Sequence, residues 1–381
     1  MLRIFARAMA VLCLALTTAS CVATPSQTYP QPEVSVVTVP PVITPHKSSA
    51  PIPTFAYQRV TTPWKNGDFE KGIQIFWHYP ASDIDTTHKA DFLLDYAVSL
   101  GANSVAISFP IYTDGVKPTR VYTDAATPTP EQLGLVVDEA KKRHLRVMIR
   151  PIIDETNIVA QDPVGWRGSI RVADTAAWFA SYDAVISSYV PMAVSHGVDE
   201  FVAGTELVSL QKQTAQWRAL IQQIQSQGFT GKISYAGNWS GGLVDAFPTL
   251  GTDAYPAIQL GDSATVEQLT GAITAWMMKT YTADERSRMT VQEAGIPAIS
   301  SMYAHPWYWG TTANPILNFT VQANWFAAMY QAARAAGMQG IYYWTLDTNL
   351  YAPVANPQTD YPGSFYGRPA ANTIRQQFTN S

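Results

Sequence analysis

The chain lacks the side chains and motifs on which several classes of enzyme depend. Both of its cysteines, Cys13 and Cys21, lie near the N-terminus, so the folded part should contain neither a disulfide nor a thiol nucleophile. Its histidines are scattered without the His-Glu-x-x-His spacing of zinc hydrolases, and we expect no metal and no cofactor. No Gly-x-Ser-x-Gly motif and no glycine-rich nucleotide motif occurs. These absences argue against cysteine, serine, metal and dinucleotide chemistry.

Charge of either sign is also scarce. Only 14% of residues are charged, the formal net charge is −4, and no basic run occurs, so we expect no nucleic-acid partner. Beyond the N-terminal segment no apolar run is long enough to span a bilayer, which argues against a transmembrane domain. We expect a monomer that contacts a membrane only through a lipid anchor.

The first residues have the pattern of an export signal. Arg3 and Arg7 supply positive charge, residues 8–16 form an apolar run, and small residues follow. The run is too short to span a bilayer permanently. We therefore interpret residues 1–23 as a signal peptide and expect a bacterial protein that is exported from the cytoplasm.

Two fates remain open for the mature N-terminus. Cys21 directly follows small residues and resembles the lipidated cysteine of a bacterial lipoprotein signal, although Thr18 stands where leucine is usual. The alternative is ordinary cleavage near Ala19 or Ala23, which would release a secreted protein. The protein is accordingly expected to be lipid-anchored at the outer surface or secreted.

Residues 24–63 have a different composition from the rest. Proline, serine and threonine dominate, with almost no charge and few large apolar residues. Such a segment cannot bury enough apolar surface to offset the entropy lost on ordering. It is predicted to be a disordered, extended linker that leads to a catalytic domain at residues 64–381.

The remaining sequence alternates short apolar segments with amphipathic ones. Expected strands cover residues 72–77, 104–109, 145–151, 200–205, 232–236, 250–254, 289–292 and 340–345. Strands that are apolar on both faces, each followed by a helix, indicate a parallel sheet covered by helices. Eight such units predict an α/β fold of the (β/α)8 TIM-barrel type. An open doubly wound sheet is the alternative, but its glycine-rich motif is missing.

Two glutamates lie where a barrel places its chemistry. Active sites of these barrels form at the carboxyl ends of the strands, and only Glu206 and Glu293 occupy such positions, on the fourth and seventh strands. A pair of carboxylates is the minimum equipment for cleaving a glycosidic bond. Alternatively, either glutamate could be the buried or loop-borne partner of an ion pair.

The sequences around these glutamates resemble glycoside hydrolase family 113, known for endo-β-1,4-mannanases within a clan of retaining barrel glycosidases. The matching phrases are AGTEL at 203–207, YAGNW at 235–239, GTDAY at 251–255, QEAGIP at 292–297 and GIYYW at 340–344. The resemblance implies that Glu206 is the acid/base and Glu293 the nucleophile. Thr205 replaces an asparagine that many clan members use to bind the sugar 2-hydroxyl, so that contact stays unassigned.

Aromatic side chains at strand ends are candidates for sugar platforms. Sugars have flat apolar faces, which pack on aromatic rings. We expect Trp77, Trp239 and Trp344 to bind substrate, with Trp344 beneath the cleaved sugar. Residues 298–319, which contain Trp307 and Trp309, form a long expected strand-to-helix loop that should shape the site.

Polar residues at the same end complete the predicted site. Tyr255 is a candidate donor to Glu293, and Arg150 could supply positive charge, with a structural ion pair as its alternative role. His78 and Asn238 are plausible partners for sugar hydroxyls, although either could merely fix a loop.

Two functions remain after these considerations. The first is a retaining glycosidase that cleaves a β-linked polysaccharide, most plausibly β-1,4-mannan or a related hexose polymer, by double displacement. The second is a non-catalytic glycan-binding barrel at the cell surface. Only the first requires two carboxyl groups held about 5 Å apart.

Overall fold

The computed structural model describes residues 57–240, 242–308, 315–348 and 363–380. The predicted signal peptide at 1–23, with Cys21, lies outside the described residues, as do residues 24–56 of the predicted linker. Within the described part of the chain, no helix combines the length and apolarity needed to cross a bilayer.

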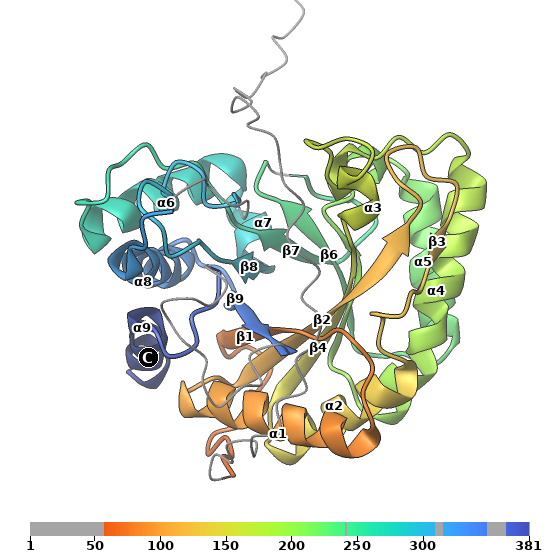
Figure 1. The fold of residues 1–381 in the computed structure, drawn as a ribbon, viewed down its shortest axis with the longest axis horizontal. Coiled ribbons are helices and arrows are strands. Elements are labelled where there is room, and N and C mark those ends of the chain that lie inside the picture. The colour runs from red at the N-terminus through yellow and green to blue at the C-terminus, as the bar shows by residue number, and fades with distance from the viewer. Residues whose placement is uncertain (1–56, 241, 309–314, 349–362, 381) are drawn as a thin grey trace, which may run out of the picture. The chain divides into compact units, whose positions relative to one another are not determined.

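Eight parallel strands close into a barrel (Figure 1). They are β1 (Glu70–Phe76), β2 (Ser104–Thr113), β4 (Arg146–Ile153), β5 (Glu200–Thr205), β6 (Lys232–Asn238), β7 (Thr249–Asp253), β8 (Met289–Ala294) and β9 (Gly340–Asp347). The barrel closes because β1 pairs with both β2 and β9. A short strand, β3 (Val121–Tyr122), adds to β2 in antiparallel fashion. The predicted TIM barrel is confirmed, although β2 and β4 extend beyond their expected ends.

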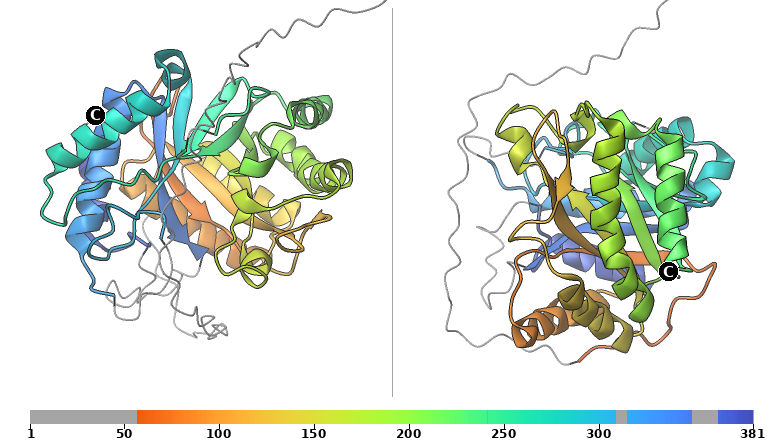
Figure 2. Two further views of the ribbon diagram at one scale, coloured as in Figure 1. Left: turned by 90° about the horizontal axis from the view of Figure 1, so that it is seen from above. Right: turned by 90° about the vertical axis from the view of Figure 1, so that its right-hand side faces the viewer.

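Helices form the outer layer around this barrel (Figure 2). The longer ones are α1 (Asp83–Ser99), α2 (Pro130–Lys142), α4 (Thr175–Ser195), α5 (Thr214–Ser226), α6 (Val266–Thr280), α8 (Phe319–Ala335) and α9 (Pro369–Thr379). The short ones are α3 (Thr156–Val159), α7 (Ala283–Ser287), η1 (Arg167–Ser169) and η2 (Val208–Leu210). Thr129 caps α2 and Pro130 occupies its first turn.

The expectation that a helix follows every strand is wrong at one connection. In the residues described between β6 and β7, the chain forms turns and irregular backbone instead of a helix. Gly242 and Pro248 fall in this short connection, and both residue types disfavour a helix interior. The barrel is therefore regular in its strands and irregular in its helical layer.

The core has an inner and an outer part. Inside the barrel, five fully buried side chains form a separate cluster: Ala106, Met148, Val202, Ala236 and Tyr342. The outer faces of the strands pack against the helices in one continuous apolar cluster. This two-sided burial explains why the strands read as apolar on both faces.

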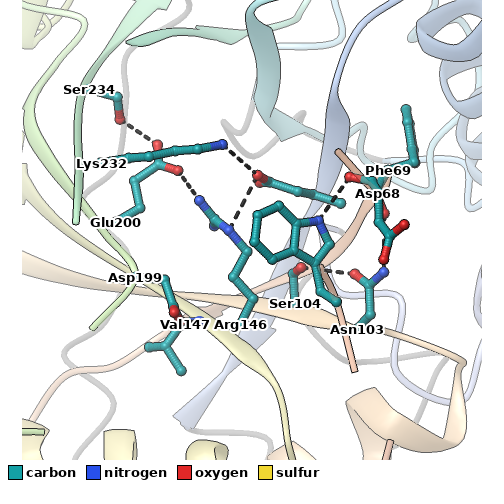
Figure 3. A network of polar contacts seen from close by, with 12 residues as sticks. Asp68, Phe69, Asn103, Ser104, Arg146, Val147, Asp199, Glu200, Lys232 and Ser234 are labelled. Carbon is teal, nitrogen blue, oxygen red and sulfur yellow. Dashed lines mark hydrogen bonds and ion pairs between the residues drawn. The ribbon is translucent and has the colours of Figure 1, made fainter. Parts of the chain in front are cut away.

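A second pair of buried glutamates lies at the amino ends of the strands. Glu70 and Glu200 both contact Arg146, and Glu70 accepts a hydrogen bond from the Tyr342 hydroxyl at 2.8 Å. Figure 3 shows Arg146 and Ser234 reaching Glu200. The Arg146 guanidinium lies 5.1 Å from the ring centre of Trp64. This network closes the barrel opposite the face where catalysis takes place in such folds.

Gly72 permits the tight packing of the inner core. A Cβ atom at this position would overlap the ring of Tyr342, which is itself buried and tied to Glu70. Gly72→Ala should therefore lower the free energy of unfolding, measured by urea denaturation, by about 1–3 kcal/mol. Gly271→Ala is the matched control, because that helical glycine has open space around it and alanine favours helix. Equal stability of both variants would contradict this account of the inner core.

Candidate active site

Glu206 stands directly after β5 in an unusual backbone conformation. Its φ of 54° lies in the left-handed region, which non-glycine residues rarely adopt. Its amide donates to the Ala236 carbonyl at 2.8 Å, so the residue stays tied to β6. The register of β5 against β6 shifts between Val202 and Gly204, just before this turn. As a result Glu206 is only 5% exposed at the carboxyl end of the barrel.

Glu293 lies near the end of β8 and accepts two hydrogen bonds. Arg150 donates to its Oε2 at 2.5 Å, and the Tyr255 hydroxyl donates to its Oε1 at 2.5 Å. Burial, followed by the negative charge of Glu293, raises the pKa of Tyr255 well above its ordinary value, so the phenol keeps its proton. The predicted donation from Tyr255 to Glu293 is present, and the positive charge expected of Arg150 lies against the same carboxylate. An acceptor-only carboxylate held between two donors matches the needs of a nucleophile.

Arg150 is fully buried and also contacts Asp253, at the end of β7. One guanidinium thus compensates two carboxylates, Asp253 and Glu293. Arg150 therefore makes a structural ion pair, with Asp253, and also contacts Glu293. Positive charge placed in this way lets two acidic side chains remain in a largely buried site.

Arg167, on η1, is a site residue that the sequence reasoning missed. Its Nη1 donates to Glu206 Oε2 at 2.7 Å, and its Nη2 lies 3.1 Å from Glu155 Oε1. Its Nε donates to the Ile153 carbonyl at 2.9 Å. No motif marks this arginine; the one available signal is a cation in the loop that follows a strand end.

The environment of Glu206 favours its protonated form. Burial raises the pKa of this carboxyl, Arg167 lowers it and the negative charge of Glu293 raises it, and together these effects bring the pKa from 4.5 to about 7. The Oε1 atom of Glu206 is buried and has no hydrogen-bond partner among the described residues. Near neutral pH, Glu206 can therefore hold a proton and give it up, as a general acid must.

A row of tryptophans extends from the acidic centre. Trp239, after β6, meets Tyr255 edge-on with ring centres 6.0 Å apart. Trp307 stacks on Trp239 at 5.3 Å, and Trp166 lies on it at 6.1 Å. All three indoles are half-buried. The parts of these rings that the stacking leaves open are aromatic surface of the kind that sugar rings pack against.

Most of this chain matches the model of one protein family. The model of Glycoside Hydrolase Family 113 matches residues 77–368, most of the chain. The chain belongs to Glycoside Hydrolase Family 113. It is therefore a glycoside hydrolase, and the resemblance noted from its sequence is confirmed. A search of curated proteins finds no match.

Solved structures of the same family share the fold. One β-1,4-mannanase of family 113, solved as a complex, is 22% identical over 82% of this chain and all of its own, with a TM-score of 0.68. The family 113 β-mannanase AaManA from Alicyclobacillus acidocaldarius, in complex with ManMIm, is 20% identical over 82% of this chain and 98% of its own, with a TM-score of 0.68. An exo-β-1,4-mannosidase from Opitutaceae bacterium strain TAV5 is more distant, at 14% identity over 84% of this chain and 62% of its own, with a TM-score of 0.51.

The other predicted contact residues of this family 113 chain differ in accessibility. Trp77 is 2% exposed within the apolar core, so its ring is packed away and does not form the predicted platform. Trp344 is half-buried, 5.6 Å from the ring of Phe76. His78 Nε2 lies 2.8 Å from Asp347, and Asn238 accepts from the Ser240 hydroxyl at 2.6 Å. Asn238 thus holds the turn at Ser240, and its contact with a sugar hydroxyl stays a prediction, as does that of His78. Trp309 lies outside the described residues.

The described residues contain no cluster of three or more His, Cys, Asp or Glu side chains that could hold a metal ion. The acidic residues at this site are instead paired with arginines, as Arg150 and Arg167 show.

Removing the Arg150 cation should destabilise this glycoside hydrolase. Arg150→Met would leave the carboxylates of Asp253 and Glu293 without their shared buried partner. We expect the free energy of unfolding at pH 7 to fall by roughly 3–5 kcal/mol. Asp253→Asn in the same chain should restore part of the loss. The exposed Arg288, paired with Asp284, provides the control, and Arg288→Met should leave the urea midpoint unchanged. An Arg150→Met variant as stable as the parent would contradict the charge-compensation argument.

Proposed function

We propose that this glycoside hydrolase cleaves β-1,4-mannan, or a closely related β-linked hexose polymer, with retention of anomeric configuration. In this proposal Glu206 is the acid/base and Glu293 the nucleophile. The proposal rests on the different surroundings of the two carboxyl groups. Glu293 is held by two donors, whereas burial favours the protonated form of Glu206.

The reaction would proceed in two displacements. Glu206 gives its proton to the departing glycosidic oxygen while a Glu293 oxygen attacks the anomeric carbon, forming a glycosyl-enzyme ester. Glu206, now ionised, then removes a proton from water, whose oxygen attacks the same carbon and releases Glu293. Each displacement inverts the carbon, so the configuration is retained. Arg150 and Tyr255 would keep Glu293 fixed during attack.

Two observations support a polysaccharide as substrate. The half-buried indoles of Trp166 and Trp307 stack on Trp239, which contacts Tyr255, so several aromatic rings gather beside the acidic centre. The family 113 structures similar to this chain are named as β-mannanases. A wall of this kind suits a chain of sugars with exposed apolar faces.

Incubation with a panel of mannan, glucomannan, xylan and β-glucan tests the proposal. Chromatography of the products should reveal manno-oligosaccharides from mannan and none from xylan. Release of products only from xylan or β-glucan would overturn the substrate assignment. Binding of mannan without any products would favour the non-catalytic alternative.

We also propose that the protein acts outside the cytoplasm, attached through a lipid at Cys21. The support is the pattern of residues 1–23 and the small residues before Cys21. Expression in a bacterium fed radiolabelled palmitate should label the parent chain and not the Cys21→Ala variant. An unlabelled parent chain in the medium would favour simple secretion.

A further inference from the structure

Arg167 approaches the proposed acid/base from one side only. It binds Oε2 of Glu206, whereas Oε1 of the same carboxyl has no partner in the described structure. A guanidinium has five donors and no acceptor, and it stays charged. A proton on Oε2 would therefore point at a cation that cannot receive it. The proton carried by Glu206 belongs on Oε1.

The guanidinium of Arg167 is itself held in place by two other groups. Its Nε is bonded to the carbonyl of Ile153, the last residue of β4, and its Nη2 is paired with Glu155. The backbone amide of Arg167 also donates to Glu155 Oε1 at 3.2 Å. These three contacts, with Ile153 and Glu155, leave the guanidinium of Arg167 little freedom to move. The Oε2 atom of Glu206, which accepts from this guanidinium, is therefore held in place as well.

We infer that Arg167 is a positioning residue that makes Oε1 the proton-carrying oxygen of Glu206, and that Glu155 holds Arg167 for this task. The inference rests on the proposed role of Glu206 as acid/base. Glu155 also adds a negative charge beside Arg167, which offsets the tendency of the arginine to drive the proton from Glu206.

Other charged or titratable groups act on Glu206 from the surrounding elements, and all are common to the variants compared below. They are Glu293 on β8, Arg150 on β4, Asp253 and Tyr255 at the end of β7, and Tyr235 on β6. Because these groups stay constant, a change measured after altering Arg167 or Glu155 reports the contribution of that residue.

Direct titration of Glu206 tests the electrostatic part without requiring a substrate. Carboxyl ¹³C NMR of glutamate-labelled protein, with the Glu206 signal assigned by its loss in Glu206→Gln, gives the titration midpoint. Arg167→Met should raise the midpoint by about one pH unit or more, and Glu155→Gln should lower it. Arg167→Lys, which keeps the charge, should stay near the parent. Midpoints that do not move would overturn the inference, whatever the substrate proves to be.

Leaving-group dependence tests the positional part. An aryl β-mannobioside with a dinitrophenyl leaving group needs little acid assistance, whereas mannan needs it fully. Arg167→Met and Arg167→Lys should both lose at least about tenfold in kcat/KM on mannan and much less in kcat/KM on the aryl substrate, because kcat/KM reports the first displacement, in which only the poor leaving group of mannan needs the proton. Equal losses on both substrates would indicate general disruption and contradict the inference. A parent enzyme inactive on both substrates would instead refute the proposed function, while the titration result would still stand.

Discussion

Replacing Glu293 by glutamine is expected to reduce kcat on mannan by ~10⁴-fold or more while leaving polysaccharide affinity nearly unchanged. The amide has the same shape but cannot form the glycosyl-enzyme ester. Neighbouring contacts should survive in part, because the Tyr255 hydroxyl can still donate to the amide oxygen. Reducing-sugar release measures turnover, and affinity electrophoresis in mannan-containing gels measures binding.

The matched control for this change is Glu267→Gln, in the first turn of α6. It makes the same chemical replacement at an exposed position on the helical layer, so activity should stay at the parent level. If Glu293→Gln kept activity within tenfold of the parent, Glu293 would not be the nucleophile. Loss of both activity and mannan binding would point to a collapsed site rather than to a missing nucleophile.

Replacing Glu206 by glutamine should reduce kcat on mannan by ~10²–10⁴-fold and change the pH profile. In the parent enzyme the first step needs protonated Glu206, whose pKa burial raises to about 7. The value of kcat/KM for the parent should therefore fall as pH rises above about 7. The glutamine variant cannot titrate, so this alkaline fall should be absent from its residual activity.

Glu131→Gln, in the first turn of α2, provides the corresponding control and should keep the parent profile. Parent and variant are both followed across pH on mannan, with more enzyme and longer incubation for the weak variant. An alkaline fall near pH 7 that persisted in Glu206→Gln would assign that titration to another group. Glu206 would then lose its role as the acid.

The barrel and its two acidic positions could be predicted because both depend on local pattern. Strands apolar on both faces follow from burial between an inner core and a helical layer, and the strand ends follow from them. The sequence positions of Glu206 and Glu293 at strand ends are thus enough to find them. The contact of Tyr255 with Glu293 follows because Tyr255 comes just after β7, the strand that pairs with β8. Parallel pairing turns a linear order of strands into neighbours in space.

What could not be predicted depends on loop path and on side-chain direction. Arg167 reaches Glu206 only because the loop after β4 folds through α3 and η1, an arrangement without a periodic signal. Trp77 follows a strand end, which is where a sugar platform is expected, but its side chain is buried in the apolar core. The register between β1 and β9 shifts near Ile75, and such irregularities alter side-chain direction in ways that composition does not encode.

Mass spectrometry of a trapped glycosyl-enzyme tests the central claim most directly. A 2-deoxy-2-fluoro mannobioside with a good leaving group slows the second displacement and lets the ester accumulate. After proteolysis, we expect one 2-deoxy-2-fluoro-mannobiosyl group bound to the peptide that contains Glu293, with no label in the Glu293→Gln variant. A label on Glu206, on another carboxylate, or none at all in an enzyme active on mannan would contradict it.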